Sequence, residues 1–137
     1  MLVRYEVSLW SAIDQELARG DEINLGQLHA LRVVDRYDGR LRVQDLRAEI
    51  GITVGAASKL VDRLERDGLV TRGENPSDRR SSLIALTPAG QQALTSAMVV
   101  CRCVLDRALG AEEVQVLTRP LERLQARLGA PAAGMAA

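Results

Sequence analysis

The sequence predicts a mostly helical protein of the α+β class, built around a helix-turn-helix unit that is followed by a β-hairpin. Two amphipathic segments, 43–50 and 53–67, are joined by a short turn containing glycine, which is the helix-turn-helix arrangement. Two short apolar runs, 69–72 and 82–86, flank a Pro-bearing loop and indicate a two-stranded hairpin. Because an isolated hairpin is marginally stable in water, we expect it to pack on the helices.

Length and composition fit one globular domain. The chain has 137 residues, of which 47% are hydrophobic and 26% charged, enough for a core of its own. Its 18 basic and 18 acidic side chains cancel, so only the placement of basic residues can indicate an anionic partner. No apolar run approaches the ~20 residues of a membrane span. Glu6, Asp14 and Glu16 interrupt the N-terminal apolar pattern, which argues against a signal peptide and for a cytoplasmic protein without a membrane partner.

The sequence shows no motif that indicates catalysis or a cofactor. His29 is the single histidine and has no cysteine or second histidine at ligand spacing, so we expect no metal site. There is no nucleophile elbow and no phosphate-binding glycine loop. We therefore expect neither a cofactor nor an enzyme; turnover in a hydrolase or transferase screen would contradict this.

Local signals set the ends of the first helices. An amphipathic helix is expected over 2–19, with Ile13 and Leu17 on its apolar stripe. Asn24 is a suitable N-cap for a second helix, which the Tyr37-Asp38-Gly39 stretch ends.

Further caps delimit the later helices. Gly51 suits a left-handed C-cap for the helix over 43–50, and Thr53 can cap the next helix. After the hairpin, Thr87 caps a long helix with Pro88 at its first position, where a missing N–H costs nothing.

The C-terminal part indicates helix–helix packing. The long helix is expected to end near Leu109, and Gly110-Ala111 separates it from a last helix, in which Pro120 predicts a kink. Apolar residues recur in that last helix with the spacing typical of packed helices: Val114, Leu117, Leu121, Leu124 and Leu128. The small helix-turn-helix unit cannot cover these terminal stripes alone, which predicts a homodimer.

The helix over 53–67 separates its apolar and basic residues onto opposite faces. Ala57, Leu60, Val61 and Leu64 share an arc of about 100° on a helical wheel. Lys59, Arg63 and Arg66 share the opposite side. This outward face indicates either a recognition helix in the major groove of DNA or a solvated helix face with internal ion pairs.

The hairpin loop carries two adjacent arginines at a tip that buries nothing. A basic tip beside a recognition helix can enter the adjacent minor groove, so we interpret Arg80 as a minor-groove probe. Arg79 and Arg72 are then expected on phosphates. Asp78 is expected to hold the Arg80 guanidinium by a charge-assisted hydrogen bond. The alternative is a solvated turn with an incidental acid–base pair.

Residues 51–70, GITVGAASKLVDRLERDGLV, and 75–90, NPSDRRSSLIALTPAG, strongly resemble the MarR family of bacterial transcription regulators. The resemblance is close over about 41–90, and the flanking helices agree in order and length. It implies a winged helix-turn-helix with flanking dimerisation helices, in a homodimer that binds a roughly palindromic double-stranded DNA site, usually as a repressor. It assigns the winged helix-turn-helix to 24–90, the dimerisation helices to 1–22 and 88–129, and a flexible tail to 130–137.

The family pattern also assigns residue roles by position. The recognition helix matches 53–63, and Asp78 and Arg80 match the wing Asp-x-Arg. The predicted DNA-binding residues are Thr53, Val54, Gly55, Ala56, Ser58, Lys59, Arg63, Arg72, Asp78, Arg79 and Arg80.

This chain departs from the family pattern at two places. The family often has polar residues early in the recognition helix, where this chain has 54–57, VGAA, which can touch a thymine methyl but form no side-chain hydrogen bonds to bases. Direct readout is therefore expected to rest on Ser58, Lys59 and Arg63, with shape readout through the wing carrying more of the specificity. Arg42 stands where the family commonly has a capping Ser or Thr.

The resemblance further implies a small aromatic effector, because many members bind aromatic acids between the dimer helices and the winged unit. Tyr5, Trp10 and His29 are the candidate pocket residues. The alternatives are that Trp10 belongs to the interface core and that His29 is an ordinary helix residue. Cys101 and Cys103 point roughly 200° apart on a helix and cannot easily bond to each other; helix packing and an intersubunit disulfide are both open.

A winged-helix module for protein–protein interaction is the main alternative function. The discriminating feature is the basic surface of Arg63, Arg79 and Arg80, which such a module does not require.

Overall fold

The computed structural model describes residues 1–20 and 23–128. The tail predicted for 130–137 lies outside these residues. The elements in chain order are α1 (Leu2–Arg19), α2 (Leu25–Arg36), α3 (Val43–Ile50), α4 (Val54–Arg66), β1 (Val70–Glu74), β2 (Ser82–Leu86) and α5 (Pro88–Leu128). The predicted order of helices and hairpin is confirmed, so the fold is mostly helical with one small sheet.

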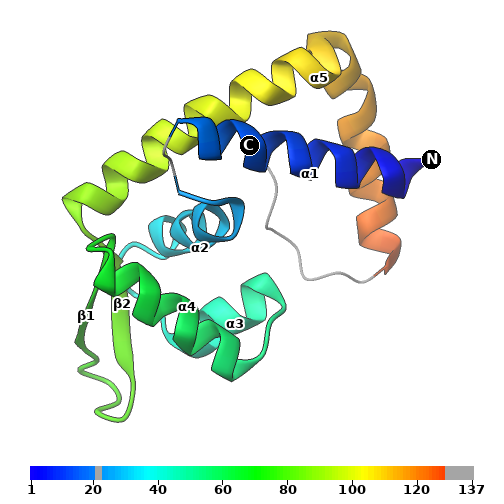
Figure 1. The fold of residues 1–137 in the computed structure, drawn as a ribbon. Coiled ribbons are helices and arrows are strands. Elements are labelled where there is room, and N and C mark those ends of the chain that lie inside the picture. Colours follow the sequence, from blue (N-terminus) through cyan, green and yellow to red (C-terminus); the bar gives the residue numbers. More distant parts are fainter. Residues whose placement is uncertain (21–22, 129–137) are drawn as a thin grey trace.

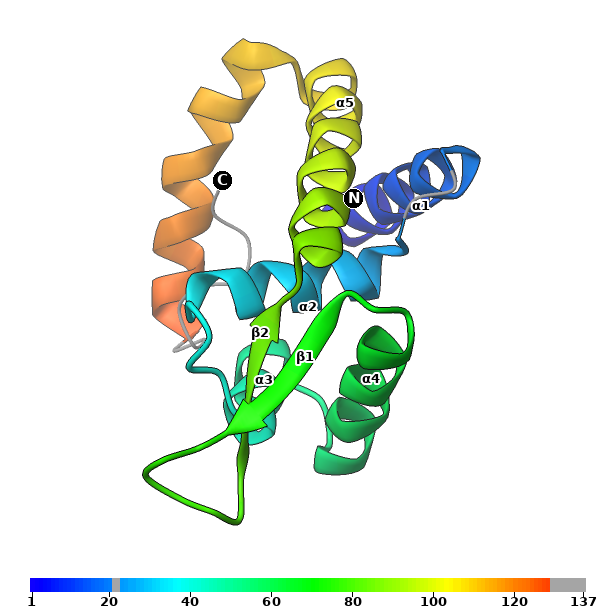
Figure 2. The same cartoon turned by 90° about the vertical axis from the view of Figure 1, so that its left-hand side faces the viewer.

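The elements form two parts that meet at α2 (Figures 1 and 2). α1 and α5 pack on each other at one end, and α3, α4 and the hairpin lie at the other end. α2 contacts both α5 and α3, and so joins the two parts. No helix in the described part of the chain is long and apolar enough to cross a membrane.

The helices begin and end where local side chains satisfy their backbone groups. Asn24 accepts from the Gln27 amide at 2.9 Å, and the Gln27 side chain accepts from the Asn24 amide at 3.0 Å. Thr53 Oγ1 accepts from the Ala56 amide at 3.2 Å, and Gly51 takes a left-handed φ of 74° at the end of α3. These capping predictions are confirmed, because capping depends on residues within one turn.

The hairpin is fastened at its base and along its β2 edge. Thr87 Oγ1 donates to the Gly68 carbonyl at 2.6 Å and accepts from the Gly90 amide at 2.9 Å, so the cap of α5 also holds the start of the hairpin. Along the β2 edge, the Ile84 amide donates to the Leu41 carbonyl at 2.7 Å. The hairpin therefore packs on the helices, as its marginal intrinsic stability requires.

The sharp bend of α5 lies at Gly110 (Figure 1), where the backbone has φ 67° and ψ 160°. The break predicted at Gly110-Ala111 is confirmed, whereas Pro120, where we predict a kink, keeps helical backbone angles. A glycine takes a positive φ without steric cost, so the chain reverses at Gly110 and α5 consists of two helical segments.

One continuous core joins α1, α2, α3, α4, the hairpin and the first segment of α5. Its fully buried large side chains include Leu17, Leu31, Leu41, Leu46, Leu64 and Ile84. This core fixes the orientation of α4 and of the hairpin relative to each other.

Candidate nucleic-acid interface

α4 buries one face and exposes the other, as its sequence predicts. Ala57, Val61 and Leu64 are fully buried against the core. Lys59, Arg63 and Arg66 are exposed on the opposite face, and none of these side chains is bonded to another group within the described residues. Three unpaired cations therefore lie on the outer face of this helix.

The first turn of α4 presents few polar side chains. Thr53 Oγ1 is engaged as the helix cap by the Ala56 amide, and Ser58 is half-buried. Gly55 is exposed, and Val54 retains 54% of its accessible surface. The outer surface of this turn is therefore apolar.

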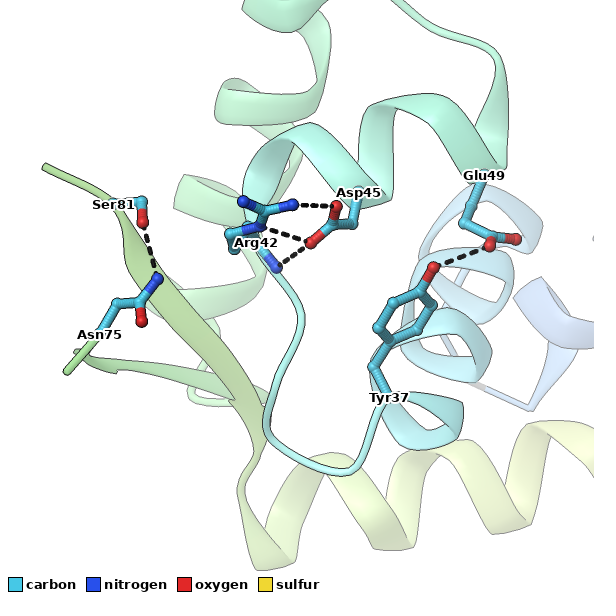
Figure 3. Close-up of polar contacts among 6 residues, drawn as sticks. All are labelled: Tyr37, Arg42, Asp45, Glu49, Asn75 and Ser81. Atoms are coloured by element: carbon cyan, nitrogen blue, oxygen red, sulfur yellow. Dashed lines mark hydrogen bonds and ion pairs between the residues drawn. The ribbon is translucent and has the colours of Figure 1, made fainter. Parts of the chain in front are cut away.

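We call the hairpin, residues 70–86, the wing. A network of hydrogen bonds fixes the loop at its tip. Asn75, only 9% exposed, donates through Nδ2 to Ser81 Oγ at 2.8 Å (Figure 3) and accepts from the Ser77 amide at 3.1 Å. The Ser81 amide in turn donates to the Asp78 carbonyl at 3.1 Å. Because both sides of the loop are tied together, the tip is held in one shape before any partner binds.

Asp78 supports Arg80 differently from our prediction. Its carboxylate accepts from the backbone amide of Arg80 at 3.0 Å and does not bond to the guanidinium. The prediction of a side-chain pair is wrong, because an Asp side chain reaches the amide two residues further on and closes a local turn. Within the described residues, the guanidinium groups of Arg79 and Arg80 form no bond with another group, and both residues are exposed.

Arg72 links the wing to α4. Its two terminal nitrogens lie 2.6 Å from an Asp62 oxygen and 2.6 Å from a Glu65 oxygen. The hydrogen bond with Asp62, together with the charge of Glu65, raises the pKa of Arg72 above its ordinary value. We therefore correct the phosphate role predicted for Arg72: its guanidinium is already committed to two carboxylates. The signal in the sequence was the pair of acids three residues apart on α4, but their partner on β1 is not local.

Arg42 and Asp45 replace the usual cap at the start of α3 (Figure 3). The Asp45 carboxylate accepts from the Arg42 backbone amide at 3.1 Å and from its Nε and Nη2 at 2.9 Å each. The hydrogen bond with Arg42 lowers the pKa of Asp45. The Arg42 side chain has no hydrogen-bond acceptor and so cannot cap the helix itself. Asp45, at the third helical position, instead accepts from the Arg42 amide.

A second network joins α2 to α3. Tyr37 donates to Glu49 at 2.9 Å (Figure 3), and Arg36 Nη2 lies 2.7 Å from the other Glu49 oxygen. The hydrogen bond with Glu49 raises the pKa of Tyr37.

An open cavity of about 660 Å³ lies between α2 and the first segment of α5. Its lining carries charges of both signs, with Arg32, Arg36 and Arg102 beside Asp35 and Asp106. His29, Met98 and Cys103 also line it. His29 Nε2 is buried without a hydrogen-bond partner in the described part of the chain. Burial, followed by the charges of Arg32 and Arg36, lowers the pKa of His29.

Only one of the three predicted pocket residues lines this cavity. His29 does, whereas Tyr5 and Trp10 are not part of the lining. Tyr5 donates to the Ala108 carbonyl of α5 at 3.2 Å, and Trp10 Nε1 donates to Glu6 on α1 at 3.3 Å.

The two cysteines are free thiols in different settings. Cys101 is half-buried, and burial raises its pKa, whereas Cys103 is exposed and lies in the cavity lining.

Sequence comparisons find similarity to transcription regulators. The model of the MarR family matches residues 22–81. The uncharacterized HTH-type transcriptional regulator YfiV of Bacillus subtilis (strain 168) is 30% identical over 82 residues, which cover 60% of this chain and 46% of the relative. The uncharacterized HTH-type transcriptional regulator YcgE of the same organism is 28% identical over 101 residues, covering 64% of this chain and 66% of the relative. The chain thus spans less than two thirds of each of these relatives.

Solved structures share the fold. CouR from Rhodococcus jostii RHA1 bound to p-coumaroyl-CoA superposes with a TM-score of 0.81 at 23% identity, covering 96% of this chain and 92% of CouR. A mutant of MarR from E. coli complexed with operator DNA superposes with a TM-score of 0.78 at 21% identity, covering 90% and 89%. Together with the match of the MarR family model to residues 22–81, these structures show that the chain has the winged helix-turn-helix fold of these regulators.

Proposed function

We propose that the protein is a homodimeric, sequence-specific DNA-binding repressor that binds a palindromic double-stranded operator and works in the cytoplasm. One observation carries this proposal: basic side chains lie on both α4 and the wing tip, and none of them is bonded to another group within the described residues. Lys59 and Arg63 lie on α4, and Arg79 and Arg80 lie on the wing tip. α4 and the wing lie at the same end of the molecule (Figures 1 and 2).

Each basic group has a proposed place on the duplex. α4 enters the major groove, where Lys59 and Arg63 reach phosphates or guanine edges. Arg80 enters the adjacent minor groove, and Arg79 binds a phosphate. Thr53 and Asp78 act indirectly, by capping α4 and by closing the wing turn. The complex of E. coli MarR with operator DNA supports this arrangement as a family precedent.

The dimer rests on apolar surface that a single chain leaves exposed. Leu2, Val3 and Val7 of α1 are exposed, as are Val116, Leu117, Leu121 and Leu124 of α5. Both groups belong to the terminal helices assigned to dimerisation. A two-fold dimer through them would place two copies of α4 about one turn of DNA apart, ~34 Å, which matches two half-sites of a palindrome.

The cavity between α2 and α5 favours an anionic effector. In its lining the three arginines Arg32, Arg36 and Arg102 outnumber the two acids Asp35 and Asp106, and Met98 adds an apolar wall. An aromatic carboxylate fits this chemistry, since it brings both a charge and an apolar ring. CouR, of the same fold, was crystallised with p-coumaroyl-CoA. Titration with aromatic carboxylates, followed by calorimetry, should show binding that Arg102→Ala weakens; equal binding by both proteins would count against this site.

The test of the DNA-binding proposal is selection from random-sequence duplexes with the purified protein. A regulator should enrich one palindromic motif, with its half-sites about one turn apart. Enrichment of no motif, together with capture of a protein by the surface containing Arg63, Arg79 and Arg80, would favour the protein–protein interaction module instead.

A further inference from the structure

Gly55 lies at the second position of α4, although the fold does not require a glycine there. Its φ is not positive, unlike those of Gly51 and Gly68 at the ends of α3 and α4. A Cβ built on Gly55 would have no atom of the described residues within 4 Å. Glycine is less favourable than alanine in a helix. The fold therefore does not require a glycine here, and an exposed glycine allows a partner to approach the backbone of this turn closely.

Val54, next to Gly55, exposes an apolar side chain on the same turn. The residue keeps 54% of its accessible surface, although a β-branched hydrophobic residue is ordinarily buried. Gly55, Lys59 and Arg63 are also exposed, so this apolar turn continues into the cationic face of the same helix. Val54 therefore presents an apolar side chain at one end of the cationic face of α4, a face that attracts polyanions.

We propose that Val54 and Gly55 determine operator specificity by apolar contact in the major groove. Gly55 lets the first turn of α4 approach the base edges closely, and Val54 packs against the C5-methyl group of a thymine. That methyl is the apolar group that unmodified bases present in the major groove. The operator therefore carries a thymine at one defined position of each half-site. This inference rests on the proposed DNA-binding function and adds the base and the residues that read it.

The first test removes only the methyl group from the DNA. In the duplex that the wild-type protein selects, each thymine is replaced in turn by deoxyuridine, and the dissociation constant is measured by fluorescence anisotropy. One position per half-site should show about a four-fold loss, the equivalent of ~0.8 kcal/mol for one buried methyl group. Val54→Ala should bind the thymine and deoxyuridine duplexes equally. A scan without any such position, or a Val54→Ala protein that still distinguishes the two duplexes, would overturn the inference.

The second test separates the effect of Gly55 on the stability of the fold from its effect on DNA binding. Gly55→Ala is compared with Gly26→Ala, because Gly26 holds the same second position in α2 and its added Cβ would meet only Asn24 Oδ1 at 3.4 Å. Both substitutions should raise the thermal midpoint by about 2–4 °C. Only Gly55→Ala should lose about ten-fold or more in operator affinity, since an extra methyl group in a close interface is poorly accommodated. Unchanged operator binding by Gly55→Ala would refute the close approach.

The outcomes distinguish this inference from the function on which it rests. If the wild-type protein enriches a motif but neither test shows its effect, the inference falls and the DNA-binding function stands. If the wild-type protein enriches no motif at all, both fall.

Discussion

Arg72 neutralises two carboxylates on the helix that we propose faces DNA, and Arg72→Gln removes that neutralisation. Asp62 and Glu65 each lie 2.6 Å from the Arg72 guanidinium. Without this cation, both acids remain charged on α4, close to the unpaired Lys59 and Arg63. The variant should therefore lose affinity for DNA through repulsion, although Arg72 itself touches no phosphate in this account.

Coulomb's law gives the expected loss of DNA affinity, and the exposure of the three side chains sets the expected loss of stability. One carboxylate and one phosphate ~8 Å apart in water repel by about 0.5 kcal/mol, so two such pairs cost about 1 kcal/mol, a roughly five-fold loss of affinity. Stability should fall by a similar ~1 kcal/mol, because the Arg72, Asp62 and Glu65 side chains are 29%, 58% and 39% exposed and such pairs are screened.

The assay is a salt-titrated binding measurement on four proteins: wild type, Arg72→Gln, the triple variant Asp62→Asn/Glu65→Gln/Arg72→Gln, and Arg19→Gln. The single variant should be weakest at low salt, and its defect should shrink as screening increases. The triple variant should return to within about two-fold of wild type, because the repelling charges are gone. Arg19→Gln, which breaks an exposed pair with Glu16 on α1, should bind as wild type. A triple variant as weak as the single one would refute charge neutralisation and point to a geometric role for Arg72.

The remaining predictions concern the wing, the dimer and the cavity. Arg80→Ala should weaken specific binding by ~1–3 kcal/mol, and unchanged affinity would contradict the minor-groove assignment. Arg79→Ala should weaken all duplexes alike and lower the salt slope by about one unit, whereas a loss confined to one base position would exclude the phosphate role. Leu117→Arg or Leu121→Arg should give monomers in sedimentation while Gln115→Arg stays dimeric; a dimeric leucine variant would argue against this interface. The lowered pKa of His29 means that the unfolded chain binds a proton more readily, so stability should fall as the pH drops below about 6.5 and stay unaffected above it. His29→Gln should flatten this dependence in thermal melts at pH 5.5 and 7.5, and identical curves for both proteins would show that His29 does not contribute.

The sequence predicts the features of this fold that depend on neighbouring residues. Asn24, Thr53 and Thr87 each cap a helix through the amide three residues further on, so local sequence alone identifies the helix starts. The two faces of α4 follow in the same way from helical periodicity. Gly110-Ala111 likewise predicts the break between the two helical segments of α5, whereas Pro120, where we predict a kink, stays helical.

Contacts between distant segments could not be predicted. Arg72 meets Asp62 and Glu65 only because β1 docks beside α4, and that geometry depends on the whole core. His29 lines the cavity, whereas Tyr5 and Trp10 do not. The sequence could not predict this difference, because the apolar stripe of α1 does not specify how α1 crosses α5. The wing tip combines both cases: its arginines are evident in the sequence, whereas the Asn75–Ser81 bond that shapes the loop requires the structure.

The most direct test of the central claim is fluorescence anisotropy of the purified protein with its selected duplex, titrated with salt against excess unrelated DNA. The account predicts saturation at two chains per palindromic site and affinity at least about 10³-fold above that for unrelated DNA at physiological salt. Equal affinity for both duplexes, vanishing together as the salt concentration rises, would contradict it.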